Sequence, residues 1–257
     1  MRRSLTTLAA TALAATAVVI AGQPVTTTAA ANDEVFLVAE AFTYDEGDAV
    51  TAAATAASAA GACEDTTYAL KTWKVGTLNW MYNGQGVPAN IASTALASIT
   101  TSTNTVAKGT NRCGLAPLTT STYNYAGTTT LKPQVSSTAT CTGNDNKSVT
   151  GWGALPTKVL AYTCTYYNAK GVVIASDTLI DNVAYTWFTT KPANCTGAQY
   201  DLETTLTHER LHTAGLGHVD QTNNATQTMT PASSPCDTSR RLLGAGDYAG
   251  LKALASK

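Results

Sequence analysis

All three histidines of this 257-residue chain lie within the stretch HERLHTAGLGH, which runs from His208 to His218. On a helix, His208 and His212 would point to the same face one turn apart, so both imidazoles could reach one metal ion. Asp201 is a suitable N-cap for that helix, and Glu203 places a negative charge in its first turn. The stretch therefore predicts a helix that carries two metal ligands.

Gly215 supplies the turn that brings back the third histidine. Glycine commonly ends a helix in the left-handed conformation, so the chain can return His218 to the same metal ion. Three imidazoles with one open position are typical of catalytic zinc, whereas structural zinc is normally held by four protein ligands. Glu209 is then placed to accept a proton from a water molecule that the zinc makes acidic, and to pass it to the leaving amine of a peptide bond.

The five-residue pattern H-E-x-x-H also occurs by chance on exposed helices, where its side chains are merely solvated. Here the glycine and third histidine at fixed offsets, in a chain without spare histidines, favour a zinc site. No histidine remains for a Ser-His-Asp triad. One alternative is a non-catalytic secreted zinc-binding or adhesion module, and another is a disulfide-rich structural protein without metal. Glu209, which a structural role does not require, favours the enzyme.

The N-terminal residues have the pattern of a secretory signal peptide. Arg2 and Arg3 precede an apolar run from about Leu8 to Ala21, and small residues follow. We therefore expect residues 1–31 to be a signal peptide and the protein to be secreted and extracellular. The apolar run is too short for a membrane-spanning helix of about 20 residues, which leaves an uncleaved anchor as the minor alternative.

The rest of the chain divides into two parts by composition. Residues 32–62 are acidic and then rich in small residues, and we interpret them as a linker or short pro-segment outside the core. We interpret residues 63–257 as the catalytic domain. Sixteen basic and seventeen acidic residues leave no net field to attract nucleic acid or anionic lipid. We expect a monomer whose partners are protein or peptide substrates, with neither nucleic acid nor membrane as a partner.

The six cysteines all follow the predicted signal peptide. An even number in an oxidising compartment predicts three disulfides. The chain has no C-x-x-C pair, so neither a cysteine zinc site nor a redox motif is expected. The spacing alone does not fix the connectivity. We expect neighbours along the chain to pair, as Cys63–Cys113, Cys141–Cys164 and Cys195–Cys236.

Hydrophobic patterning predicts both strands and helices. Strands are expected at 74–83 and 122–130, and a hairpin at 158–167 and 171–189 around a short turn with glycine. Residues 141–156 are expected to form a loop. A helix is predicted within 86–106, beginning at Pro88, and a closing helix within 244–257.

The pattern H-E-x-x-H-x-x-G-x-x-H, completed here by the three histidines, Glu209 and Gly215, resembles that of the metzincin metallopeptidases. The resemblance is closest to the matrixin-like secreted bacterial metalloproteases and covers most of the chain from about Trp73. It implies an α+β zincin fold with a twisted mixed sheet, an active-site helix, an irregular C-terminal subdomain and a closing helix. It also implies one catalytic Zn²⁺ and endopeptidase activity. Calcium is frequent in that family, but no D-x-D-x-D-G run places it here.

The same resemblance implies roles for further residues. Met229 in QTMTP would be the methionine of a turn beneath the metal, and Asp247 the aspartate that supports this turn. A place in the core is compatible with that role, because this methionine is not a ligand. Leu160 and Ala161, in the edge strand VLAYT, would offer backbone groups to an extended peptide. Pro231 would line the pocket after the cleaved bond.

The chain also departs from the family. Arg210 and Leu211 stand where matrixins usually have an apolar residue and glycine, so packing behind the helix is expected to differ. Asp220 either orients His218 or is an ordinary solvated turn residue. The sequence NRCGLAP, around Cys113, resembles a latency switch, but its position inside the expected catalytic domain favours a disulfide.

Overall fold

The computed structural model describes residues 34–44, 61–119 and 121–257. The predicted signal peptide and residues 45–60 lie outside the described residues. The helices and strands are, in chain order, β1 (Val35–Tyr44), β2 (Ala69–Leu70), β3 (Thr77–Tyr82), the 3₁₀ helix η1 (Ala89–Ile91), α2 (Ala95–Lys108), β4 (Thr122–Thr128), β5 (Ser148–Gly153), β6 (Val159–Asn168), β7 (Val173–Asp181), β8 (Thr186–Phe188), β9 (Gln199–Asp201), α3 (Leu202–Ala214), β10 (Leu216–Gly217), β11 (Ala232–Ser233) and α4 (Ala245–Ala255).

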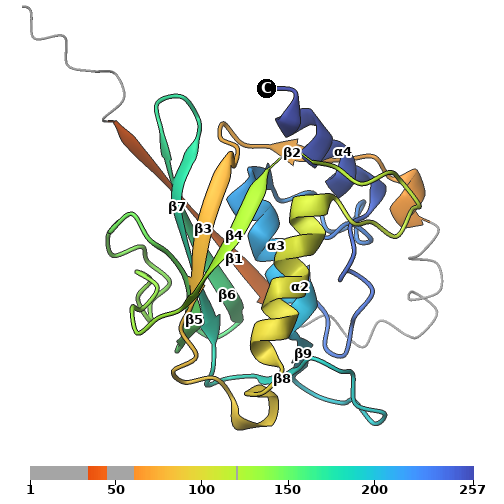
Figure 1. Cartoon of the computed structure of the whole chain (residues 1–257). Helices are drawn as coiled ribbons and strands as arrows, with labels where there is room; N and C mark the ends of the chain where they lie inside the picture. Colours follow the sequence, from red (N-terminus) through yellow and green to blue (C-terminus); the bar gives the residue numbers. More distant parts are fainter. Residues whose placement is uncertain (1–33, 45–60, 120) are drawn as a thin grey trace, which may run out of the picture. The chain divides into compact units, whose positions relative to one another are not determined.

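Seven strands form one mixed sheet in the order β11-β1-β6-β7-β5-β3-β4 (Figure 1). The pairs β3–β4, β3–β5, β5–β7 and β1–β11 are parallel, whereas β1–β6 and β6–β7 are antiparallel. Two short pairs, β2–β10 and β8–β9, stand apart from this sheet. The protein is therefore of the α+β class with a mixed sheet, as the sequence predicted.

Helices α2 and α3 pack side by side against the sheet (Figure 1). On β3, Leu78, Trp80 and Tyr82 are buried and alternate with less buried residues, as expected for a half-buried strand. These side chains share one apolar cluster with Ile99 of α2 and Leu206 of α3. The cluster fixes α3, and thus the predicted histidine helix, against the sheet.

Several local predictions are confirmed. The predicted hairpin is formed by β6 and β7, and the closing helix by α4. The helix expected from Pro88 is interrupted, because a single 3₁₀ turn is followed by α2, which begins only at Ala95.

The prediction of a loop over residues 141–156 is wrong for Ser148–Gly153. This segment is strand β5, which lies between β3 and β7 and pairs in parallel with both. Five of its six residues are buried, so it lacks the alternation by which a half-buried strand is recognised. Its glycines and polar residues further resemble loop composition.

The prediction that residues 32–62 lie outside the core is wrong for Val35–Tyr44. This segment is strand β1, inserted between β6 and β11, and its Phe42 side chain is 0 % exposed. Its sequence VFLVAEAFTY is rich in β-branched and aromatic residues, a signal that the acidic and small-residue surroundings obscured. As a consequence, β6 is not an edge strand, because β1 covers the side that the resemblance assigned to substrate.

All six cysteines are paired, as Cys63–Cys113, Cys141–Cys164 and Cys195–Cys236, the order expected along the chain. Cys113 is thus part of a disulfide, not a latency switch. Three disulfides suggest an oxidising environment. Among the described residues, no helix has the length and apolar composition to cross a membrane.

Candidate metal centre

Helix α3 begins and ends at the residues that the sequence singled out. The Asp201 carboxylate accepts a hydrogen bond from the Thr204 backbone N–H at 3.0 Å, which caps the N-terminus. Gly215 ends the helix with φ of 113°, and a Cβ atom there would lie 2.2 Å from the Trp73 carbonyl oxygen. Only glycine fits this turn. Strand β10 then pairs with β2 and brings the chain back to His218.

The Nε2 atoms of the three histidines converge. The separations are 2.9 Å for His208–His212, 3.1 Å for His208–His218 and 3.0 Å for His212–His218. Zinc–nitrogen bonds of about 2.0–2.1 Å in a tetrahedral arrangement place ligand nitrogens roughly 3.3 Å apart, so a slight spreading of the rings admits an ion. The three side chains form a group that could hold a metal ion.

The other ring nitrogens are held by backbone carbonyls. His208 Nδ1 lies 2.7 Å from the Thr228 oxygen, and His212 Nδ1 lies 3.0 Å from the Leu216 oxygen. A carbonyl only accepts, so each Nδ1 carries the proton and each Nε2 keeps its lone pair for a metal. Burial lowers the pKa of all three imidazoles and favours the neutral form that metal binding requires.

Glu209 lies on α3 next to the first histidine, and its side chain is 0 % exposed. Burial raises the pKa of Glu209 to about 8, while the Thr163 hydroxyl and the Phe42 backbone N–H partly oppose this rise. Neither carboxylate oxygen accepts a hydrogen bond of standard geometry from the described residues. The carboxylate is therefore a buried base without a fixed partner. A cation at the histidines would lower its pKa again.

The turn at Met229 is fixed by Asp247. The Asp247 carboxylate accepts hydrogen bonds from the backbone N–H groups of Thr228 at 2.8 Å, Met229 at 3.1 Å and Gly244 at 2.9 Å. The Met229 side chain is buried in the apolar cluster that also contains Leu211 and Leu243. Since the Thr228 carbonyl holds His208, this network positions the first histidine from behind.

Strand β1 crosses the histidine cluster. The Phe42 ring stacks on the His208 imidazole, with ring centroids 3.9 Å apart and planes inclined by 20°. Thr43 donates to the Pro231 carbonyl oxygen from its backbone N–H at 3.1 Å and from its hydroxyl at 3.0 Å. Glu40 forms an ion pair with Lys71. These contacts could not be predicted from the sequence, because the composition around this segment is typical of a linker outside the core.

The remaining candidate residues lie as follows. Ala161 pairs with Phe42, and Leu160 is a fully buried residue at the bulge of the β1–β6 ladder. The exposed Asp220 accepts hydrogen bonds from the backbone and side chain of Asn223 at 2.9 and 2.8 Å, which identifies it as a turn residue. No hydrogen bond joins it to His218 in the part of the chain that the structure describes.

Arg210 explains the departure at the position after Glu209. Its guanidinium is fully buried 5.0 Å above the Trp80 ring and donates to Thr103 at 3.1 Å and Thr150 at 2.7 Å. The arginine thus fills the space behind α3, between α2 and the sheet.

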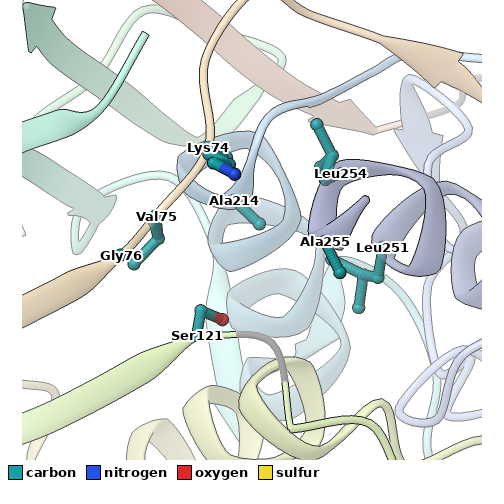
Figure 2. A pocket seen from close by; sticks show the side chains of 8 residues that line it. All are labelled: Lys74, Val75, Gly76, Ser121, Ala214, Leu251, Leu254 and Ala255. Carbon is teal, nitrogen blue, oxygen red and sulfur yellow. The ribbon is translucent and has the colours of Figure 1, made fainter. Parts of the chain in front are cut away.

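A pocket lies on another side of α3 (Figure 2). It is lined by residues 74–76, Ser121, Ala214 and three residues of α4. It contains neither histidine nor carboxylate, so it has no part in the candidate chemistry.

No protein-family model matches the chain, and comparison with curated proteins finds no significant match. The function must therefore be inferred from the site itself.

Proposed function

We propose that the protein is a secreted zinc-dependent endopeptidase. The observation that carries this proposal is the convergence of three imidazole Nε2 atoms on one point, with the buried Glu209 next to the first of these histidines on the same helix. Three ligands leave a tetrahedral metal one open position, which is the arrangement of catalytic sites. The resemblance of HERLHTAGLGH to the metzincin pattern points to the same activity.

Zinc suits this ligand set, because three histidines without a carboxylate or thiolate form a site that it commonly occupies. When bound, zinc would act as a Lewis acid that polarises the peptide carbonyl and makes a water molecule more acidic. Secretion agrees with the three disulfides and with the predicted signal peptide.

The protein side chains have separate tasks in this reaction. Glu209 accepts a proton from the attacking water and then delivers it to the nitrogen of the broken peptide bond. Neither of its oxygens accepts a hydrogen bond of standard geometry from the described residues, so its lone pairs are available for that transfer. The carbonyls of Thr228 and Leu216 hold two imidazole rings in orientation, so that the site is formed before substrate binds.

The test measures zinc content and hydrolysis of casein or gelatin in the same samples. Glu209→Gln is compared with Glu203→Gln, which removes a carboxylate from the first turn of the same helix. Because Phe42 of β1 packs against His208, the intact chain is assayed together with a chain that is cut after β1, between residues 44 and 61. We expect one zinc per chain in every sample, hydrolysis that a chelator abolishes, and loss of hydrolysis only for Glu209→Gln. Stoichiometric zinc without hydrolysis in any sample would instead support a non-catalytic zinc-binding module.

A further inference from the structure

Strand β1 lies between two elements that have no other link to each other in the sheet. It runs antiparallel to β6 and parallel to β11, and nine residue pairs join it to β6, from Val35–Asn168 to Thr43–Val159 (Figure 1). Without β1, this side of β6 would expose its backbone N–H and C=O groups. Such an edge binds an extended peptide by strand addition.

The register of β1 places residues 40–43 across the histidine cluster. Glu40 pairs with Lys71 near His218, and Thr43 bonds to Pro231 beyond the cluster. Between them, the Phe42 ring lies against His208, and Phe42 pairs with Ala161 of β6. The Ala41–Phe42 peptide bond, which precedes this ring, therefore lies beside the first candidate ligand, whose neighbour along α3 is Glu209.

Burial along β1 is concentrated at this crossing. Val35, Phe36 and Leu37 at the start of the strand are 37 to 48 % exposed, whereas Phe42 is 0 % exposed. Phe42 is thus the side chain that anchors the strand. A bound peptide substrate would need the same backbone groups of β6 and the same space beside His208.

We propose that β1 occupies the substrate-binding position in the register of a peptide, with the Ala41–Phe42 bond at the catalytic centre, and that the intact chain is therefore self-inhibited. This inference deepens the proposed function and rests on it for the identity of the blocked activity. The occupant is a segment of the same chain, so inhibition is independent of protein concentration and ends when β1 leaves.

The test separates β1 from the rest of the protein and changes none of the residues that the structure describes. The recognition sequence of a specific protease replaces residues 51–57, and the secreted chain is compared before cleavage, and after cleavage and separation. Two readouts are taken: hydrolysis of a quenched peptide and amide hydrogen exchange of β6. A synthetic peptide of residues 34–44 is then added back, in its natural form and with Phe42→Ala.

We expect separation to raise hydrolysis at least about tenfold and to speed exchange of the β6 amides. The natural peptide should reverse both effects, and the Phe42→Ala peptide should bind at least about tenfold more weakly, because its anchor is lost. In the uncut chain, Phe42→Ala should raise hydrolysis more than Phe36→Ala, which removes the same atoms from the exposed end of the strand.

The readouts separate the two proposals. Equal hydrolysis by the intact and separated chains, or unchanged hydrogen exchange of the β6 amides, would overturn self-inhibition. Neither result would contradict the proposed peptidase function. If the natural peptide protects β6 but no form of the protein hydrolyses peptides, β1 occupies a peptide-binding site and the peptidase assignment fails. Equal binding of the natural and Phe42→Ala peptides would overturn the register proposed here.

Discussion

Single residues outside the three histidines hold the candidate metal centre in place. The Asp247 carboxylate fixes the backbone of Thr228 and Met229, and the Thr228 carbonyl in turn fixes the His208 ring. Asp220, only two residues after His218, bonds instead to its own turn. Closeness in sequence to a ligand is thus a poor guide to a supporting role.

These two aspartates give a matched pair of variants. Asp247→Asn replaces one acceptor oxygen by an amide that faces backbone N–H groups, so the turn should loosen. We expect zinc affinity to fall by about 10- to 100-fold, the range typical for loss of a supporting partner. Asp220→Asn should leave zinc affinity unchanged. Competitive zinc titration measures both, and similar affinities for the two variants would refute the supporting role of Asp247.

Residue spacing sufficed to predict the centre itself. His208, His212 and His218 lie together because a helix, a left-handed glycine and a short turn are all local features. The contacts of Phe42 and Arg210 could not be predicted in this way. Phe42 reaches His208 from 166 positions earlier in the chain, and Arg210 is buried only because α2 and the sheet surround it.

Among the elements, strands could be predicted where alternation or a run of β-branched and aromatic residues marks them, as in β3 and in the hairpin of β6 and β7. β5 could not be predicted in this way, because five of its six residues are buried and its glycines and polar residues resemble a loop. β5 is held partly by a side chain of its neighbour. Asp177 on β7 accepts a hydrogen bond from the Val149 backbone N–H at 2.9 Å.

This buried carboxylate predicts a pH dependence of stability. Burial raises the pKa of Asp177 to about 7, well above the value of about 3.9 for an unfolded aspartate. The folded state therefore binds the proton more tightly than the unfolded state does, so proton binding by Asp177 stabilises the fold. This stabilisation is lost as pH rises from about 4 to about 7. The loss is on the order of a few kcal/mol.

Asp177→Asn removes this titration. Urea unfolding between pH 4 and pH 8 should show that the stability difference between Asp177→Asn and the natural protein shifts in favour of the variant as pH rises. A difference that is constant across this range would mean that Asp177 is ionised in the folded protein throughout.

In the whole molecule, strand β1 packs directly against the candidate metal centre. β1 completes the sheet between β6 and β11 and places its only fully buried side chain, Phe42, against the ring of His208, one of the three candidate ligands. The pairing of β1 with β11 thereby joins an N-terminal strand to the C-terminal part of the chain, which also contains the Met229 turn. Long-range pairing of this kind is invisible to local patterns.

The register of β1 also predicts substrate preference. If β1 binds as a substrate does, the residue after the cleaved bond occupies the place of Phe42 beside His208. We therefore expect an aromatic residue there to be preferred over alanine by about 10- to 100-fold in kcat/KM, as for a large apolar side chain in a buried site. Cleavage of a peptide library by the separated chain, followed by identification of the new N-termini, measures this. A library cleaved without regard to that residue would contradict the register.

We propose that Glu209 transfers the proton at a zinc ion held by the three histidines. The most direct measurement is kcat/KM for a quenched peptide with the zinc-loaded chain after separation of β1, for the natural protein and Glu209→Gln. We expect one zinc in each protein and a rate lower by about 10²- to 10⁴-fold in the variant, the range for loss of a general base. Equal rates in two proteins with equal zinc content would contradict it.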